Sequence, residues 1–163
     1  MKHWLIKSEP EEYSFARLKK EGSTWWEGVR NYQARNFMMK DMKVGDLALF
    51  YHSNAEPPGV AGIAVVSSAA KPDALQFDKK SDFYDARSKK DAPAWHCVEF
   101  KFHSDIKRFV TLEEIKKNKN LAKMLVVQRG QRLSVQPVTI AEFNEVLKMA
   151  DQTIPKDLPL ENA

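Results

Sequence analysis

Two apolar runs separated by a short segment of chain breakers constrain the fold more than any other feature of this sequence. The runs are GDLALFYHS (45–53) and GVAGIAVVSSA (59–69), and the intervening NAEPPG contains two prolines and a glycine. Apolar runs of this length that end in Gly, Pro and Asn are typical of strands joined by a turn. We therefore predict that the two runs form an antiparallel pair of strands.

Two further segments have the pattern of strands. HWLIKS (3–8) is a short apolar run that ends in polar residues, and AWHCVEFKF (94–102) places side chains of different character at alternating positions. Alternation of this kind is typical of a strand with at least one buried face. The chain contains no regular β–α–β alternation and no glycine-rich phosphate loop, which argues against a nucleotide-binding doubly wound sheet.

Four segments carry helix signals. Ser14 and Gly22 suit the first and last positions of a short helix. A Thr-x-x-Glu capping box, in which the hydroxyl and the carboxylate satisfy backbone N–H groups, occurs twice. The segments are SFARLKKEG (14–22), RNFMMKDM (35–42) and the helices that begin at TLEE (111–114) and TIAE (139–142). With three or four core strands, mostly antiparallel, they predict an α+β fold, and a small barrel more than a doubly wound sheet.

The remaining segments indicate how the domain is organised. Residues 71–93 are polar and charged with only scattered aromatic residues, which predicts a long excursion over the surface. The 163 residues fit one domain, which we place at 1–150. The residues that follow, 151–163, include two prolines and are predicted to form an extended tail.

Composition narrows the functional classes. Cys97 is the only cysteine, which excludes an intrachain disulfide and indicates a reducing compartment. No apolar run is long enough to cross a bilayer, and the N-terminus does not resemble a secretory signal, so we expect a cytoplasmic protein without a membrane partner. The formal net charge of +4 permits a polyanionic partner but does not require one.

Motifs for metal binding and catalysis are missing from the sequence. The four histidines form no pair at metal-ligand spacing. Cys97 lies among apolar strand residues, and no GxSxG elbow occurs. Acidic clusters at 9–12 and 113–114 lie near helix starts, where carboxylates suit the helix dipole. We therefore expect no metal, no cofactor and no catalytic residue.

Four polar and aromatic stretches carry the strongest functional signal. They are the Lys7–Ser8 pair, WWEGVRNYQARN (25–36), FYHSN (50–54) and QRGQRLSVQP (128–137). Each stretch alone is explained equally well as a strand end or a turn. The two tryptophans could also belong to the hydrophobic core, because tryptophan is usually largely buried. Together they supply tryptophan to stack on a base, amides and hydroxyls to read its edge, and cations to hold phosphate. The side chains therefore favour a nucleic-acid ligand.

Several strings in this chain resemble the EVE-domain family, in particular its thymocyte nuclear protein-like branch. The matching strings, in chain order, are WLIKSEP (4–10), WEGVRNYQARNF (26–37), GDLALFYHSN (45–54), PGVAGIA (58–64), PDALQFD (72–78), YDARSK (84–89) and RLSVQPVT (132–139). The resemblance implies a PUA-like fold, which is a small mixed β-barrel decorated with short helices. It also implies a relationship to YTH domains, which hold a methylated adenine in an aromatic cage.

The resemblance further implies a pocket for a base and a set of residues facing phosphate. Trp26 resembles the main wall of the pocket, whereas Trp25 lies outside the matched motif, and Phe77 is an alternative to Tyr84 as a second wall. Whether Arg30 and Arg35 face a ligand or are held inside the fold is left open. The implied pocket residues are Trp26, Gly28, Val29, Arg30, Asn31, His52, Ser53, Asn54 and Tyr84, and the implied phosphate or backbone contacts are Lys7, Ser8, Arg129 and Arg132.

The function implied is a non-catalytic module that reads a modified base, either a modified cytosine in DNA or a methylated base in RNA. One alternative is an enzyme or sensor acting on a free modified nucleobase or nucleotide, for which Glu9, Glu27, His52 and Asp85 are the candidate acids and bases. A second alternative is a module that binds a peptide or a small anion. Animal relatives carry a basic N-terminal segment, and this chain begins at its first strand. We therefore expect a bacterial-like cytoplasmic form with weaker duplex binding.

Overall fold

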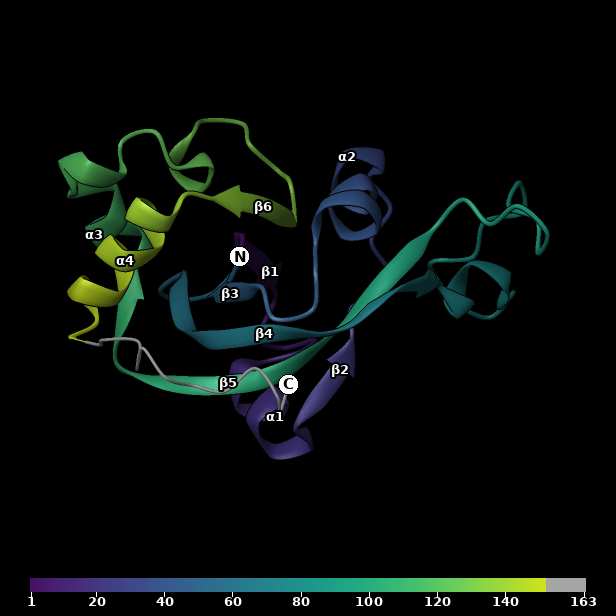
Figure 1. The fold of residues 1–163 in the computed structure, drawn as a ribbon, viewed down its shortest axis with the longest axis horizontal. Coiled ribbons are helices and arrows are strands. Elements are labelled where there is room, and N and C mark those ends of the chain that lie inside the picture. The colour runs from purple at the N-terminus through teal and green to yellow at the C-terminus, as the bar shows by residue number, and fades with distance from the viewer. Residues whose placement is uncertain (152–163) are drawn as a thin grey trace.

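The computed structural model describes residues 1–151, so the predicted tail lies outside the described residues beyond Asp151. Figure 1 shows a central sheet with short helices at one end and a long loop at the other. The strands are β1 (His3–Ser8), β2 (Ser23–Trp25), β3 (Leu47–His52), β4 (Gly59–Pro72), β5 (His96–Thr111) and β6 (Val135–Val138). The helical elements are α1 (Phe15–Glu21), α2 (Tyr32–Asn36), η1 (Phe37–Asp41), η2 (Ala74–Phe77), α3 (Leu112–Lys117), η3 (Lys119–Leu121), η4 (Leu125–Val127) and α4 (Ile140–Met149).

The strands form one mixed sheet in the order β2-β5-β4-β3-β1-β6. β3 and β4 pair antiparallel, which confirms the pair predicted from the two apolar runs. The pairing of β1 with β3 is parallel, whereas the other four pairings are antiparallel. The prediction of three or four core strands was too low, because β2 and β6 have three and four residues and are too short to show a periodicity.

The long strands β4 and β5 are bent. Their register shifts at four places between Val60 and Lys71, and such irregularities increase the local twist and curvature of a strand. Within residues 1–151, strand pairing ends at β2 on one side and at β6 on the other. One mixed sheet combined with short helices confirms the α+β class. Closure of the sheet into a barrel stays a prediction.

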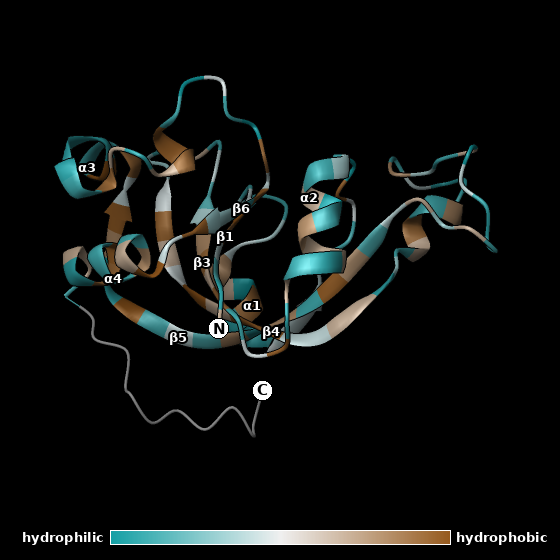
Figure 2. Cartoon of the chain, turned by 45° about the horizontal axis from the view of Figure 1, so that its top comes forward, coloured by the Kyte–Doolittle hydropathy of each residue, from teal (hydrophilic) through white to brown (hydrophobic). Residues whose placement is uncertain are grey.

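Each face of the sheet is covered by its own hydrophobic core. Trp4 and Ile6 of β1 pack in the core that α1, α2 and η1 cover, whereas Leu5 packs in the core beneath α3 and α4. Strands that are buried on both faces read as continuous apolar runs rather than as alternating ones. Figure 2 shows apolar residues along the strands and mostly hydrophilic residues on α2 and α3.

The predicted helix boundaries are confirmed at the residues that cap them. The Ser14 side chain accepts a hydrogen bond from the Arg17 N–H, and Gly22 ends α1 with a φ of 88°. Thr111 and Thr139 both form complete capping boxes at the starts of α3 and α4. The segment 35–42 is also helical, although it divides between α2 and the π-helical turn η1.

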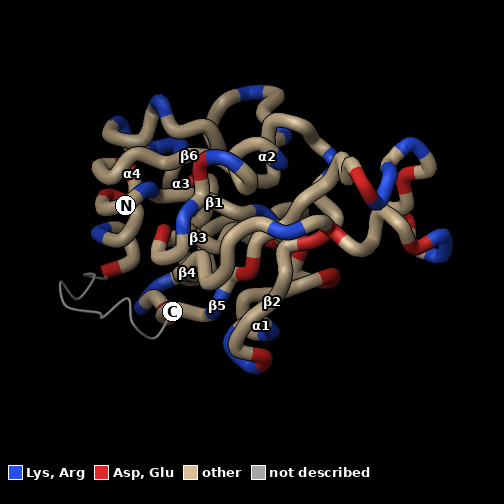
Figure 3. Tube along the Cα trace, turned by 45° about the vertical axis from the view of Figure 1, so that its right-hand side comes forward, with Lys and Arg blue, Asp and Glu red and all other residues tan. Residues whose placement is uncertain are grey.

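The predicted surface excursion is confirmed as a long loop between β4 and β5 that contains the short helical turn η2 and an isolated antiparallel bridge between Lys89 and Ala92. Figure 3 shows Lys and Arg distributed over both ends of the molecule rather than gathered in one patch. No helix within residues 1–151 combines the length and the apolarity needed to cross a membrane.

Candidate nucleic-acid interface

Two of the predicted polar stretches meet where β1 and β3 end. The parallel register sets Lys7 opposite Tyr51 and Ser8 opposite His52. Beyond the strands, the Ser53 N–H donates to the Ser8 carbonyl at 3.0 Å. Because β1 and β3 run parallel, their carboxyl ends lie side by side, and the polar residues at these ends gather in one place.

The loop 128–134 adds cations to this edge. The Lys7 N–H donates to the Ser134 carbonyl at 2.8 Å, which attaches the loop to β1. Arg129 and Arg132 are exposed, and neither forms an ion pair with any residue in 1–151. Lys7 is partly buried, and this burial lowers the pKa of its ammonium group. The Lys7 ammonium is therefore partly desolvated, whereas the two arginines of the loop that is attached to β1 are solvated.

Trp26 lies behind this edge in an aromatic cluster. Its ring centroid is 5.6 Å from that of Phe50 and 5.5 Å from that of Phe100, with both rings nearly perpendicular to the indole. Tyr13 packs edge-on at 6.5 Å, and its carbonyl accepts a 2.6 Å hydrogen bond from Ser8 Oγ. Trp26 is 9% exposed. It is therefore mostly a core residue that is connected to the site edge through Tyr13 and Phe50.

Trp25 has a different environment from its neighbour. It belongs to β2, it is partly exposed, and the Lys71 ammonium lies 3.7 Å from the centre of its ring. Of the adjacent tryptophans, Trp26 is therefore the one packed against the strands that carry the predicted site.

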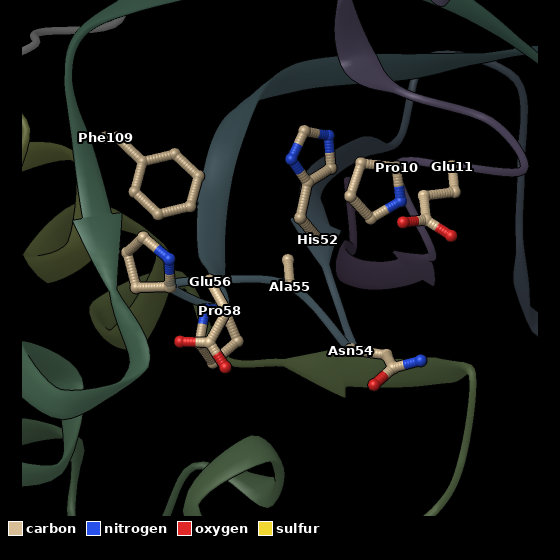
Figure 4. A pocket seen from close by; sticks show the side chains of 9 residues that line it. Pro10, Glu11, His52, Asn54, Ala55, Glu56, Pro58 and Phe109 are labelled. Atoms are coloured by element: carbon tan, nitrogen blue, oxygen red, sulfur yellow. The ribbon is translucent and has the colours of Figure 1, made fainter.

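A cavity of about 620 Å³ opens beside His52 and Asn54 (Figure 4). Its size falls within the range of small-molecule sites in proteins. Prolines and one aromatic ring supply apolar surface, and two carboxylates and an amide supply hydrogen-bonding groups. The lining residues are Pro10, Glu11, His52, Asn54, Ala55, Glu56, Pro57, Pro58 and Phe109.

The protonation state of His52 follows from its contacts. Its Nε2 accepts a hydrogen bond from the Phe15 N–H at 3.1 Å, so this nitrogen carries no proton. Burial lowers the pKa of the imidazole, which favours the neutral ring. The proton then lies on Nδ1, which makes that nitrogen a hydrogen-bond donor. Figure 4 shows the ring between Pro10 and Phe109.

The residues that follow Trp26 are directed toward the loop between β4 and β5. The Gly28 N–H and Arg30 Nη1 both donate to Asp73 Oδ2, at 2.8 and 3.0 Å. Arg30 Nε and Nη2 donate to the Phe83 carbonyl. Val29 is buried. The guanidinium of Arg30 is therefore engaged within the fold.

Asn31 and Arg35 also make structural contacts. Asn31 Oδ1 accepts from the Ala34 N–H and caps α2. Arg35 donates to the Ala94 carbonyl, and its guanidinium lies 4.7 Å from the ring centre of Tyr32, which stacks on Trp95. These contacts favour a structural role for Arg30 and Arg35 over direct contact with a ligand.

The two candidates for a second pocket wall both lie in the loop between β4 and β5. Tyr84 is 39% exposed, and Phe77 is half-buried at the end of η2. No aromatic contact joins either ring to Trp26 within the described part of the chain. The predicted site residues therefore divide into one group at the edge of β1 and β3 and a second group around Asp73.

Sequence reasoning did not single out three residues that organise these groups. Tyr13 joins Ser8 to Trp26, Asp73 holds Gly28 and Arg30, and Phe109 lines the cavity. Asp73 lies within the string PDALQFD and Tyr13 lies three residues after the string WLIKSEP, so proximity to those strings was an available signal. Phe109 lies far along β5, and it reaches the cavity because Val110 and Thr111 pair with Val60 and Gly59, which directly follow the turn at 54–58.

Comparison with known proteins identifies the class of this domain. The model of the EVE domain family matches residues 2–149. The chain belongs to the EVE domain family, as its sequence strings indicated.

Among curated proteins, the chain is similar to thymocyte nuclear protein 1 of Gallus gallus, with 43% identity covering 92% of this chain and 69% of the relative. Thymocyte nuclear protein 1 of Homo sapiens is 42% identical, covering 92% of this chain and 74% of the relative. Among solved structures, human THYN1 in complex with DNA containing 5-methylcytosine has a TM-score of 0.87 and 41% identity, over 94% of this chain and 100% of that one. A Pseudomonas syringae protein also has a TM-score of 0.87, with 38% identity over 91% of this chain and 99% of that one.

Proposed function

We propose that this protein is a non-catalytic DNA-binding module that reads a modified cytosine. The observation that carries the proposal is the similarity to human THYN1, a protein whose structure was solved with DNA containing 5-methylcytosine. That similarity extends over 94% of this chain at 41% identity. Of the two ligands that the family resemblance implies, this similarity favours a modified cytosine in DNA over a methylated base in RNA.

The edge formed by β1 and β3 supplies groups suited to this role. Arg129 and Arg132 are exposed cations available to phosphate, and Lys7 adds a partly buried one. His52 Nδ1 is a donor, and Asn54 carries an amide that both donates and accepts. Trp26 and Tyr13 provide aromatic surface behind these groups. A cytosine within a duplex must leave the stack to reach them, at a cost of a few kcal/mol.

The added methyl group alone gives only modest discrimination. Burying one methyl contributes about 0.8 kcal/mol, which corresponds to roughly a fourfold difference in affinity. Stronger selection requires hydrogen bonds that hold the base in one orientation, so that the methyl group meets apolar surface. His52 and Asn54 are the side chains that we assign to this task.

We also propose that binding is not followed by a reaction. Asp85 accepts hydrogen bonds from Trp95 Nε1 and the Arg87 N–H, and these contacts lower the pKa of its carboxyl group. Burial raises the pKa of Glu27, but no side chain in residues 1–151 pairs with it as a catalytic partner would. An enzyme would need an acid or base that is paired with a partner side chain. The contacts of Asp85 and Glu27 do not supply such a pair.

The test compares two oligonucleotides that differ only by one 5-methyl group on cytosine. Trp26→Ala is unsuitable, because truncating a buried tryptophan costs about 3–5 kcal/mol of stability. Trp26→Phe is milder, and Trp25→Phe is the matched control at the adjacent position. We expect wild type and Trp25→Phe to bind the methylated strand several-fold more tightly, and Trp26→Phe to lose that preference. Equal affinities of the wild type for both strands would reject the proposal.

The same samples test the alternative of an enzyme or sensor. The protein is incubated with the methylated oligonucleotide and, separately, with the free modified nucleoside, and the products are examined by mass spectrometry. We expect unchanged masses and weak binding of the free nucleoside. A new product, or tighter binding of the nucleoside than of the oligonucleotide, would favour the alternative.

A further inference from the structure

The loop between β4 and β5 is the largest feature that the proposed site does not use. We call residues 73–95 the arm. Figures 1 and 2 both show it extending from the end of the sheet opposite to α3 and α4. A segment of this length with so little regular structure needs internal contacts to keep a shape, and long loops of this kind often carry function.

The base of the arm is held by two side chains that have no exposed surface. Asp73 accepts from Gly28, Arg30 and the Leu75 N–H. Gln76 donates from Nε2 to the carbonyls of Asp73 and Trp95, and its Oε1 accepts from Ser88 Oγ and the Trp95 N–H. Buried polar groups with all partners present hold one conformation. The arm is therefore built as a defined structure and not as a loose connection.

The carboxylates and the lysines of the arm are used differently. Asp78 accepts from the Lys80 N–H, and Asp85 accepts from Trp95 Nε1, so both carboxylates are partly used inside the arm. Four lysines are exposed and form no ion pair within residues 1–151: Lys79, Lys80, Lys89 and Lys90. Asp78, Asp82 and Asp91 are the exposed acidic residues of the arm, and Asp85 is partly buried. The arm contains five cations and five carboxylates in total. All five cations, the four lysines and Arg87, are exposed, whereas only three of the carboxylates are, so cations outnumber acids on its outward surface.

Exposed aromatic rings lie among these lysines. Tyr84 is 39% exposed and Phe83 is 42% exposed. Phe83 has a structural role, because its ring lies against Gly28 and within 5.6 Å of the Arg30 guanidinium. Within residues 1–151, the hydrogen bond that Tyr84 forms is from its backbone N–H to the Ser81 carbonyl, and its hydroxyl forms none. Lysines interleaved with an exposed aromatic ring suit the phosphates and bases of a nucleic acid.

We propose that the arm is a second nucleic-acid contact, which binds the phosphate backbone flanking the base that is read. This inference rests on the proposed function, because it assumes a nucleic-acid ligand. Its position supports it: the arm is joined through Asp73 to Gly28 and Arg30, two and four residues after Trp26. Lys79, Lys80, Lys89 and Lys90 bind phosphates, and Tyr84 lies against a sugar or an unpaired base.

The test compares two variants of equal charge. The arm variant carries Lys→Ala at positions 79, 80, 89 and 90. The control variant carries Lys→Ala at positions 116, 117, 119 and 123, around α3 and η3 at the opposite end of the molecule (Figure 1). Each variant loses four positive charges from the formal net charge of +4, which leaves zero in both. A difference between them therefore reports the location of the charges and not their number.

Affinity for duplexes with and without 5-methylcytosine is measured between about 50 and 200 mM salt. Each phosphate contact adds about 0.9 to the slope of log affinity against log salt concentration. We expect the slope of the arm variant to fall by about 2 or more relative to wild type, and the slope of the control to change by less than 1. Asp91→Asn is expected to tighten binding about twofold or more.

Equal slopes for the arm and control variants would overturn the inference. The two hypotheses fail in different ways. A wild type that ignores the methyl group but keeps the difference in slope rejects the modified-base reading alone. A methyl preference that survives with no difference in slope rejects the arm alone. Thermal unfolding checks the fold, because the removed lysines are exposed and the one ion pair among them, Lys117 with Glu113, lies on the surface and contributes little, so the midpoint should be nearly unchanged in both variants.

Discussion

The contact between Asp73 and Arg30 gives the sharpest prediction about how this fold is held together. Asp73 has no exposed surface, and its carboxylate accepts three hydrogen bonds, from the N–H groups of Gly28 and Leu75 and from Arg30 Nη1. Asp73→Asn keeps the shape of the side chain but removes its charge. The new amide N–H₂ must then face groups that are themselves donors, and the Arg30 side chain, 20% exposed, loses its counter-ion.

Breaking a buried ion pair by removing one partner costs about 3–5 kcal/mol. The asparagine oxygen still accepts one or two of the three hydrogen bonds, so we expect the lower end, about 3 kcal/mol. With a urea m-value of about 2 kcal/mol per M for a domain of this size, the unfolding midpoint falls by about 1.5 M. The control is Asp105→Asn, whose pair with Lys19 is more than half exposed and should contribute less than about 1 kcal/mol.

Urea titrations followed by tryptophan fluorescence and by circular dichroism measure both variants. A midpoint of Asp73→Asn that falls no further than that of Asp105→Asn would refute the reasoning, because it would mean that the base of the arm contributes little to stability. The same variant should also be cut faster by proteases within residues 77–92, since the arm loses one of its two anchors.

Three further predictions concern individual side chains. Burial lowers the pKa of His52 below its usual 6.5, so the unfolded chain takes up the proton first and the free energy of unfolding falls as the pH drops through about 6.5. His52→Gln should reduce that fall between pH 7.5 and 5.5. An equally large fall in the variant would contradict this prediction. Burial raises the pKa of the Cys97 thiol from 9.0 to about 12. At pH 8 a thiol reagent should therefore react about a thousand-fold more slowly with the folded protein than with the unfolded one. Comparable reaction rates would show that the thiolate is accessible in the folded protein. Gly59→Ala should lower stability by about 2 kcal/mol in urea titrations, because the added methyl would meet the Val110 carbonyl oxygen and Thr111 Cα across the strand pair; a change under about 0.5 kcal/mol would show that β4 and β5 separate easily there.

The elements that were predicted correctly are those with strong local signals. The strands at 3–8 and 45–53, the Ser14 cap and both capping boxes depend on residues within a few positions of one another. β2 and β6 escaped prediction because they are short strands stabilised by pairing with distant partners, β5 and β1. The end of β5 at Thr111 was missed for a related reason, since its second half is mostly polar and partly exposed.

The site shows the same division. Motif resemblance directed attention to Lys7, Ser8 and His52, and the parallel register of β1 and β3 explains why these residues lie together. It could not show that Arg30 is occupied by Asp73, because the two residues are 43 positions apart and the contact exists only in the folded chain. Whether these residues bind a base stays a prediction, and the affinity measurements above address it.

The measurement that tests the central claim most directly is a titration followed by the indole N–H resonances in two-dimensional NMR spectra. The four tryptophans give four such signals. The indole N–H groups of Trp4 and Trp95 donate to Asp46 and Asp85, away from the ends of β1 and β3 where we place the base. One titration therefore gives both the affinity and the location of binding. We predict that an oligonucleotide with 5-methylcytosine shifts the Trp26 signal at several-fold lower concentration than its cytosine counterpart, while the Trp4 signal stays in place. Identical curves for the two oligonucleotides, or a Trp26 signal that never moves, would contradict the account.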